Sequence, residues 1–278
     1  MQDVMEIETL VEHFLQWCLP RRAAATVKHY RSRLRPFVER FRGRELADLT
    51  PLEIQTYLDN LNTDYAPDTQ RANIVVVETL QSWAVKMKII EQPILSKIEK
   101  PAGRLRERIP TNRETTIILR HASPEFRLVY QALRQSGARP NEIARATIED
   151  IKDGRIELTE HKTAKKTGKP RIIPIGQKFG KMIEQAVGDR KSGPIFLSPR
   201  GKAWTAANLS SNFRRIRNRM KLKKDLVLYL TRHEHATIVC DKAGIHAASR
   251  ALGHSNIQTT MRYAKDQLDT MQQNQDLV

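Results

Sequence analysis

Cysteine is scarce in the 278-residue sequence, which holds only Cys18 and Cys240. So few thiols exclude a small secreted domain built on disulfides, and the spacing of these two matches no zinc site. The sequence also lacks an apolar run long enough to cross a bilayer, and its acidic, amphipathic start, MQDVMEIETL, is unlike a secretory signal. We therefore expect a cytoplasmic protein with no membrane association and no metal site.

Acidic side chains are also in deficit. The sequence has 31 Asp and Glu against 48 Lys and Arg, which gives a formal net charge of +17 and a pI near 10.1. An excess of this size favours a polyanionic partner, usually nucleic acid, and the alternative is a basic surface that faces only solvent. The sequence contains neither a Walker phosphate loop nor an acidic metal-binding cluster, so we expect no cofactor.

Hydrophobic periodicity predicts helices without strands in the N-terminal third of the chain. The expected helices cover residues 4–18, 27–41, 50–61 and 67–89. Thr50-Pro51-Leu52-Glu53 is a capping box with proline at the first helical position, whereas Pro36 inside the second pattern predicts a kink or a break. Residues 1–98 are thus expected to form a compact helical domain.

A basic segment with several structure-breaking residues follows this domain. Residues 97–113, KIEKPAGRLRERIPTNR, have proline near both ends and a glycine between them, and we interpret residues 99–112 of this segment as a linker. Beyond it, two alternating stretches, 155–159 and 171–175, predict strands joined by a basic turn, while helices are expected over 114–122 and 124–136. The second domain, residues 113–278, is therefore expected to be mainly α with a small antiparallel β-sheet.

The polar residues within 229–265 predict a reaction site. Gly244 and Gly253 fall where helices should stop, which predicts three short helices folded on one another. Arginine binds phosphate in a two-pronged contact, imidazole donates to or accepts from oxygen, and a phenol can be a nucleophile. This combination predicts phosphoryl transfer. The side chains that such packing would leave free to converge are Arg232, His254 and Tyr263.

The same segment resembles the C-terminal signature of the tyrosine recombinases, the phage integrase family. That signature reads H-x-x-R, then L-G-H, then a tyrosine nine residues after the second histidine. Arg232, His254 and Tyr263 occupy these positions, and Tyr229 stands where the first histidine belongs.

Two further stretches carry the resemblance. Residues 136–143 are similar to the family's T-G-x-R-x-x-E-[LI] box, with Arg139 as the arginine and Glu142 placed to support it. Lys166 fits the K-x-G-K-x-R-x-x-P pattern, where the family has its catalytic lysine in the turn of the sheet. The neighbouring lysines Lys162, Lys165 and Lys169 leave the choice among them open.

The resemblance implies a site-specific DNA recombinase, with the helical N-terminal domain as a core-type DNA-binding domain before the catalytic domain. Tyr263 would attack a DNA phosphate to give a 3′-phosphotyrosyl intermediate, while Arg139 and Arg232 hold the phosphate oxygens. Lys166 would protonate the leaving oxygen, and His254 would bind the phosphate or assist the tyrosine. The implied partner is double-stranded DNA, bound by a homotetramer on paired sites whose protomers are monomeric or weakly associated without DNA.

Tyr229 is the departure from the family pattern. A phenol, with an ordinary pKa of about 10, is a poor proton acceptor at neutral pH, so we expect either a supporting role for Tyr229 or a slow enzyme. The tail, residues 264–278, has too little apolar surface to form a stable free helix. We expect it to dock in a groove on its own domain or on a neighbouring protomer.

A basic helix is expected within residues 205–225, and its cations are predicted DNA contacts. These residues are Arg214, Arg215, Arg217, Arg219, Lys221, Lys223 and Lys224. Two alternatives to a recombinase stay open from the sequence. One is a type IB topoisomerase-like enzyme that relaxes a single duplex, and the other is a non-catalytic DNA-binding protein on the same scaffold.

Overall fold

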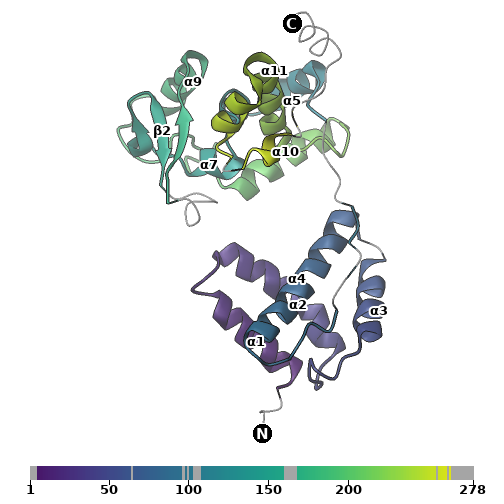
Figure 1. Cartoon of the computed structure of the whole chain (residues 1–278). Coiled ribbons are helices and arrows are strands. Elements are labelled where there is room, and N and C mark those ends of the chain that lie inside the picture. Colours follow the sequence, from purple (N-terminus) through teal and green to yellow (C-terminus); the bar gives the residue numbers. More distant parts are fainter. Residues whose placement is uncertain are drawn as a thin grey trace, which may run out of the picture. The chain divides into compact units, whose positions relative to one another are not determined.

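The computed structural model describes residues 5–63, 65–95, 98, 100–102, 108–159, 168–254, 256–261 and 263. The chain divides into two compact units, Met1–Arg106 and Glu107–Val278, called here the N-terminal unit and the C-terminal unit. Their boundary falls inside the segment that we interpret as a linker, and Figure 1 shows the helices and strands of each unit. Within the described residues, no helix is long and apolar enough to cross a membrane.

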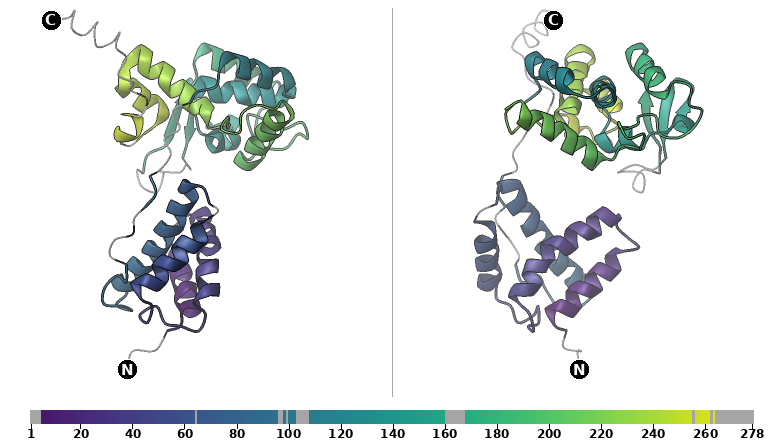
Figure 2. Two further views of the ribbon diagram at one scale, coloured as in Figure 1. Left: turned by 90° about the vertical axis from the view of Figure 1, so that its right-hand side faces the viewer. Right: turned by 180° about the vertical axis from the view of Figure 1, so that it is seen from behind.

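The N-terminal unit is built of helices. Its elements are α1 (Ile7–Cys18), α2 (Ala24–Arg40), α3 (Pro51–Asn62) and α4 (Pro67–Lys86). α1 and α4 pack against each other and against α2, and α3 packs against α4 (Figure 2). The core between them is filled by one apolar face of each helix, which is the burial that their periodicity predicts. Its most deeply buried members include Phe14, Leu34, Phe37, Leu58 and Leu80.

The two local signals singled out in this unit, at Thr50 and Pro36, have different outcomes. The capping box is present: Glu53 N–H donates to Thr50 Oγ1 at 3.2 Å, and Thr50 N–H donates to Glu53 Oε2 at 2.8 Å. Of the kink or break predicted at Pro36, the break does not occur, because α2 continues past it to Arg40. Ser32, whose carbonyl loses its helical donor to the proline, is exposed, so that water can satisfy this carbonyl.

The C-terminal unit combines helices with a small antiparallel sheet, which confirms the predicted fold class. Its elements are α5 (Asn112–His121), α6 (Pro124–Ser136), α7 (Pro140–Arg145), η1 (Ile148–Asp150), β1 (Ile151–Lys152), β2 (Arg155–Leu158), β3 (Arg171–Pro174), α9 (Gln177–Val187), α10 (Ala206–Arg219), α11 (Leu230–Leu252) and α12 (Gln258–Met261). α6 contacts both α9 and α11, and α10 packs against α5 and α7. Phe126, Tyr130 and Phe213 are buried in the core of this unit.

The sheet has the strand order β1-β2-β3, one strand more than predicted. β2 and β3 pair so that Ile156 lies opposite Ile173 and Leu158 lies opposite Arg171. β1 is only two residues long, too short for an alternating pattern, and the turn to β2 has positive φ at Asp153 and Gly154. The residues between Thr159 and Gly168 lie outside the described part of the chain.

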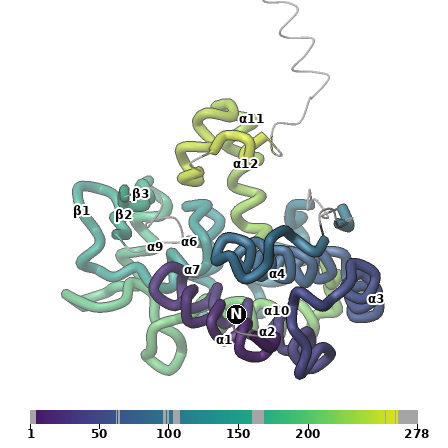
Figure 3. The backbone as a smooth tube through the Cα atoms, turned by 60° about the horizontal axis from the view of Figure 1, so that its bottom comes forward, coloured from purple at the N-terminus to yellow at the C-terminus, as the bar shows by residue number. Residues whose placement is uncertain are grey.

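The predicted glycine stops are present in the last part of the unit. Gly244, with φ of 78° and ψ of 169°, breaks the helical path inside α11, and Gly253, with φ of 63°, ends that helix. α12 then packs against α11, as the tube in Figure 3 shows. The tail, residues 264–278, on which a docking role is predicted, lies outside the described residues.

Candidate active site

The first predicted arginine stands at the start of α7. Arg139 is the N-cap residue of this helix, and its backbone N–H donates to Glu142 Oε2 at 2.9 Å. Arg139 Nη1 donates to the other oxygen, Glu142 Oε1, at 2.6 Å. The contact expected between these two residues is therefore present, and it fixes the guanidinium at the mouth of the helix.

A second buried arginine, Arg171 on β3, approaches the same carboxylate. Its side chain is 4% exposed, and its Nε lies 3.6 Å from Glu142 Oε2. Arg171 Nη2 donates to the backbone oxygen of Ala251 at 2.7 Å, which ties the sheet to the end of α11. Burial by itself would raise the pKa of the Glu142 carboxyl, but the hydrogen bond from the Arg139 backbone and the charge of Arg171 hold it below its ordinary value. The Glu142 side chain is thus an ionised, buried anion at neutral pH.

Arg232, in the first turn of α11, is fully buried. Its Nη1 donates to the Gly137 carbonyl at 2.8 Å, and its Nη2 donates to the Leu252 carbonyl at 2.9 Å. Burial, and after it the charge of Arg139, lowers the pKa of Arg232 to about 10, so that the group stays protonated at neutral pH. Arg139, Arg171 and Arg232 therefore bring three positive charges to a region where Glu142 is the carboxylate that they share. Such an excess favours the entry of an anion.

Two glycines allow these groups to approach one another. Gly137 ends α6 with φ of 60°, and a Cβ atom built there would lie 2.4 Å from His235 Cδ2. At Gly253 a Cβ atom would lie 2.7 Å from Arg171 Nη1. A side chain at either position would push apart the elements that carry the arginines, so glycine is required for the close approach.

His254, directly after Gly253, is held at both ring nitrogens. Its Nε2 lies 3.0 Å from Arg232 Nη2, and its Nδ1 lies 2.7 Å from Thr260 Oγ1. A guanidinium can only donate, so Nε2 accepts, and the ring proton lies on Nδ1, where it is donated to Thr260. The imidazole is therefore neutral in this arrangement and orients the Arg232 guanidinium. The predicted meeting of Arg232 and His254 is present.

Tyr263 reaches the site through a histidine that the sequence did not single out. Its Oη lies 2.6 Å from His233 Nδ1, and its side chain is 7% exposed. The ring packs in a small cluster with Ala236 and Leu252 of α11. Because His233 is the neighbour of Arg232 in α11, this hydrogen bond links the candidate nucleophile to the arginine cluster.

The two remaining candidates for catalysis are Tyr229 and Lys166. Tyr229 directly precedes α11, is 39% exposed, and presents its ring edge-on to His233, with the ring centroids 5.3 Å apart. Lys166 and two of its alternatives, Lys162 and Lys165, lie outside the described residues, whereas the third alternative, Lys169, is described and exposed. The role of Lys166 as the general acid stays a prediction.

The predicted DNA contacts lie on α10 and in the turn after it. The exposed members are Arg214, Arg215, Arg219, Lys221, Lys223 and Lys224, and Arg217 is half-buried. Two of these arginines also bind the unit itself, because Arg217 Nη1 donates to the Lys224 carbonyl at 2.7 Å and Arg219 Nη2 donates to the His121 carbonyl at 2.9 Å. The guanidinium of Arg217 therefore stabilises the turn that follows α10.

Three residues of this site escape prediction from the sequence: Arg171, His233 and Thr260. Arg171 does carry a usable signal, because it occupies an inward position in the alternation of β3, where a charged group needs a buried partner. The contacts of His233 and Thr260 join α11 to the segment that follows it, and no spacing rule assigns them.

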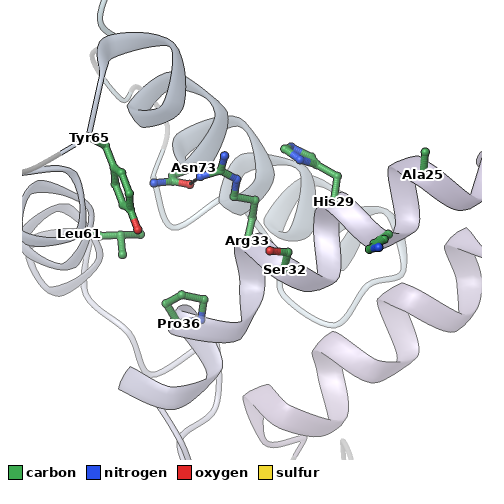
Figure 4. A pocket seen from close by; sticks show the side chains of 9 residues that line it. Ala25, His29, Ser32, Arg33, Pro36, Leu61, Tyr65 and Asn73 are labelled. Carbon is green, nitrogen blue, oxygen red and sulfur yellow. Dashed lines mark hydrogen bonds between the residues drawn. The ribbon is translucent and has the colours of Figure 1, made fainter. Parts of the chain in front are cut away.

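The N-terminal unit has a basic hollow of about 370 Å³ on the surface of α2. Figure 4 shows His29 and Arg33 of α2 beside it, with Tyr65 on the opposite side. Arg33 Nη1 donates to Asn73 Oδ1 of α4 at 2.7 Å, which orders the guanidinium. With Lys28 also in its lining, the hollow combines cations with an aromatic ring, a combination that suits a nucleic acid strand.

Known proteins share this sequence pattern and this fold. Residues 111–269 match the phage integrase family. The chain is 22% identical over 240 residues to tyrosine recombinase XerC of Pelobacter propionicus, covering 81% of this chain and 77% of that protein. It is 21% identical over 279 residues to tyrosine recombinase XerD of Staphylococcus haemolyticus, covering 92% and 94%. The crystal structure of a lambda integrase tetramer bound to a Holliday junction has a similar fold, with a TM-score of 0.79 and 17% identity over 95% of this chain and 78% of that chain.

The chain belongs to the phage integrase family, because the match covers more than half of its residues. It is a site-specific tyrosine recombinase, an enzyme that breaks and rejoins DNA, as the sequence predicts. The matches favour neither a type IB topoisomerase nor a non-catalytic DNA-binding protein.

Proposed function

We propose that this recombinase cleaves DNA by attack of Tyr263 on a phosphodiester held between Arg139 and Arg232. The observation that carries the proposal is the fully buried Arg232 guanidinium, 3.0 Å from His254 and repelled by the charge of Arg139. A phosphate bound between the two arginines would relieve this repulsion. Because negative charge spreads over the phosphate oxygens in the transition state, the same contacts would also accelerate the reaction.

The proposed reaction exchanges one phosphodiester for another. The Tyr263 oxygen bonds to phosphorus, the bond from phosphorus to the 5′-oxygen breaks, and a 3′-phosphotyrosyl intermediate and a free 5′-hydroxyl result. The 5′-oxygen takes a proton from a general acid, for which Lys166 is the candidate, while the phenol gives up its own proton. Attack by the 5′-hydroxyl of a second strand reverses these steps, so the exchange consumes no nucleotide.

Glu142 and His254 position the two arginines that bind the phosphate in this proposal. Glu142 fixes Arg139 through two hydrogen bonds, and His254 orients the Arg232 guanidinium. In the proposed complex His254 also lies beside the phosphate that Arg232 binds. Tyr229 has a supporting role in this proposal, because its ring packs edge-on against His233.

Double-stranded DNA is the proposed partner of both units. Arg214 and Arg215 of α10 are exposed cations of the C-terminal unit, and Lys28, His29 and Arg33 line the hollow of the N-terminal unit. Contacts from such side chains to phosphates give affinity without base specificity. The net charge of +17 supports the same partner.

We propose that the active assembly is a homotetramer on two paired DNA sites, formed from monomeric or weakly associated protomers. Support comes from lambda integrase, whose structure as a tetramer bound to a Holliday junction shares this fold. The reducing cytoplasm is the proposed compartment. Cys18 and Cys240 are free thiols whose pKa values burial raises, which keeps them protonated and slow to oxidise.

Trapping of a covalent intermediate tests the proposal. Sequencing of DNA bound to the purified protein first supplies the target site, and a duplex nicked next to the scissile phosphate then releases a short strand on cleavage. Wild type should accumulate as a protein–DNA adduct on denaturing gels. Tyr263→Phe should bind the duplex with equal affinity and form no adduct, because it lacks only the phenol oxygen. An adduct that forms equally well with Tyr263→Phe contradicts the proposal.

A second assay separates recombination from relaxation. Two copies of the target site on one plasmid should yield exchanged products, whereas a supercoiled plasmid without the site should stay supercoiled. Relaxation of the plasmid without the site would instead indicate topoisomerase-like activity.

A further inference from the structure

His233 contacts the hydroxyl oxygen of Tyr263, the proposed nucleophile. Its Nδ1 lies 2.6 Å from Tyr263 Oη, and both side chains are buried, at 5% and 7% exposure. A hydrogen bond of this length in a buried site is strong, and when Nδ1 carries no proton the phenol O–H is its donor. The family signature offers a histidine at the position of Tyr229, and here that ring is replaced by a phenol.

The helix explains how His233 comes close to the position of the missing histidine. Tyr229 and His233 are four residues apart at the start of α11, so they lie on the same side, one turn apart. Their rings meet edge-on at 5.3 Å between centroids, and the rings of His233 and Tyr263 lie 5.4 Å apart. The imidazole of His233 therefore packs against the rings of both tyrosines.

We propose that His233 is a catalytic residue whose Nδ1 accepts the hydroxyl proton of Tyr263 as the phenol oxygen bonds to phosphorus. This inference rests on the proposed function. The Nδ1 acceptor requires the neutral tautomer with its proton on Nε2, and proton transfer converts the ring to imidazolium. On rejoining, the imidazolium returns the proton to the departing phenolate, while the attacking 5′-hydroxyl gives its proton to the group that supplied one during cleavage.

The other ring nitrogens described near the site serve different contacts. His254 uses Nε2 on Arg232 and Nδ1 on Thr260, so that proton acceptance from Tyr263 would require both bonds to change. His235 directs Nδ1 to the carbonyl of Arg134 at 3.1 Å. An imidazole at the position of His233 is the better base than the Tyr229 phenol, because its ordinary pKa lies near neutrality.

The replacement of His233 by asparagine separates proton acceptance from hydrogen bonding. The amide of His233→Asn can reach toward Tyr263 and share a hydrogen bond, but it cannot take a proton. His246→Asn, at an exposed position of the same helix, is the matched control. All three proteins are compared in gel shifts, in thermal melts and in single-turnover cleavage of the nicked duplex.

His233→Asn should bind DNA as wild type does and cleave it about 10²–10⁴-fold more slowly, which is the usual effect of losing a general base. His246→Asn should cleave at the wild-type rate. Incorporation of a fluorinated, more acidic tyrosine at position 263 should restore much of the rate of His233→Asn, because a phenol that ionises readily needs less help from a base.

Two results would overturn the inference. One is cleavage by His233→Asn at the wild-type rate, and the other is a loss that the acidic tyrosine leaves unchanged, which would assign His233 to packing alone. If His233→Asn fails to fold, the fluorinated tyrosine is placed at position 263 of the protein that keeps His233. The cleavage rate of that protein should change little, because His233 already removes the proton. Failure of wild type itself to form an adduct would instead contradict the proposed function, so that the two failures are distinguishable.

Discussion

A Cβ atom on Gly253 would lie 2.7 Å from Nη1 of Arg171, so the end of α11 rests directly on a buried guanidinium of the sheet. The same guanidinium donates to the Ala251 carbonyl at 2.7 Å and faces the carboxylate of Glu142. His254 follows Gly253 and orients Arg232. The position of Arg232 in α11 therefore depends on Arg171, which belongs to β3.

Substitution of Gly253 should disturb this junction. Gly253→Ala should lower the free energy of unfolding by more than the about 1–3 kcal/mol that a left-handed alanine costs, because its methyl group would also displace Arg171. Gly201→Ala is the control, since Gly201 has φ of 68° with nothing within 4 Å of a built Cβ atom. Chemical denaturation measures both. An equal decrease in the free energy of unfolding of the two variants would show that the close approach of Gly253 to Arg171 does not affect stability.

The ionised Glu142 should make the free energy of unfolding of the protein depend on pH. Its folded pKa lies below the ordinary value of 4.5, so its contribution is fully present above that pH and is lost as the pH falls through the folded pKa. Glu142→Gln leaves Arg139 and Arg171 without their buried counter-ion and should cost about 3–5 kcal/mol at pH 7. Denaturation at pH 7 and at pH 3 should show that the difference in the free energy of unfolding between wild type and Glu142→Gln is smaller at pH 3. An equal difference at both pH values would contradict the assignment of a negative charge to Glu142.

The sequence predicts those features of the fold that local chemistry decides. The capping box at Thr50 and the glycine stop at Gly253 need only their neighbours, and both are present. Of the kink or break predicted at Pro36, the break does not occur, because burial of Leu34 and Phe37 on either side holds α2 together. Tertiary packing therefore overrides the local preference of proline at this position.

For the site, the sequence predicts residue types but not every pairing. The contact of Arg139 with Glu142 spans one helical turn, and the spacing alone suggests it. The contact of His233 with Tyr263 joins residues 30 apart and depends on how α11 and α12 fold on each other. The family resemblance leaves open whether His254 binds the phosphate or assists the tyrosine, whereas the geometry gives the contact with Tyr263 to His233, the histidine beside Arg232.

Substitutions at two arginines of α10 should distinguish a contact with DNA from a contribution to the stability of the fold. Arg214→Ala should reduce the slope of log affinity against log salt by about 1, as the loss of one phosphate contact does, with unfolding changed by less than about 0.5 kcal/mol. Arg217→Ala should also lower stability, because Arg217 donates to the carbonyls of Lys224 and Leu226. Salt titrations and melts of both variants test this. An unchanged salt slope in Arg214→Ala would remove Arg214 from the DNA-contact surface.

Tyr229 should prove nearly dispensable for chemistry. Tyr229→Phe keeps the ring that packs edge-on against His233 and loses only the hydroxyl, so cleavage of the nicked duplex should slow by less than about tenfold, the effect of one neutral hydrogen bond. Tyr229→Ala removes the packing as well and should slow cleavage further. If Tyr229→Phe instead lost about 10²-fold or more, the phenol would have a direct part in proton transfer.

The identity of the nucleophile is the central claim, and mass spectrometry of the trapped adduct tests it most directly. Nuclease digestion of the wild-type adduct leaves a nucleotide remnant on the attacked residue, and trypsin then places Tyr229 and Tyr263 in different peptides, since Arg232 and Arg262 lie between them. The buried Tyr263, hydrogen-bonded to His233, is predicted to carry the remnant through a 3′-phosphate. A remnant on the exposed Tyr229, with the Tyr263 peptide unmodified, would contradict the account.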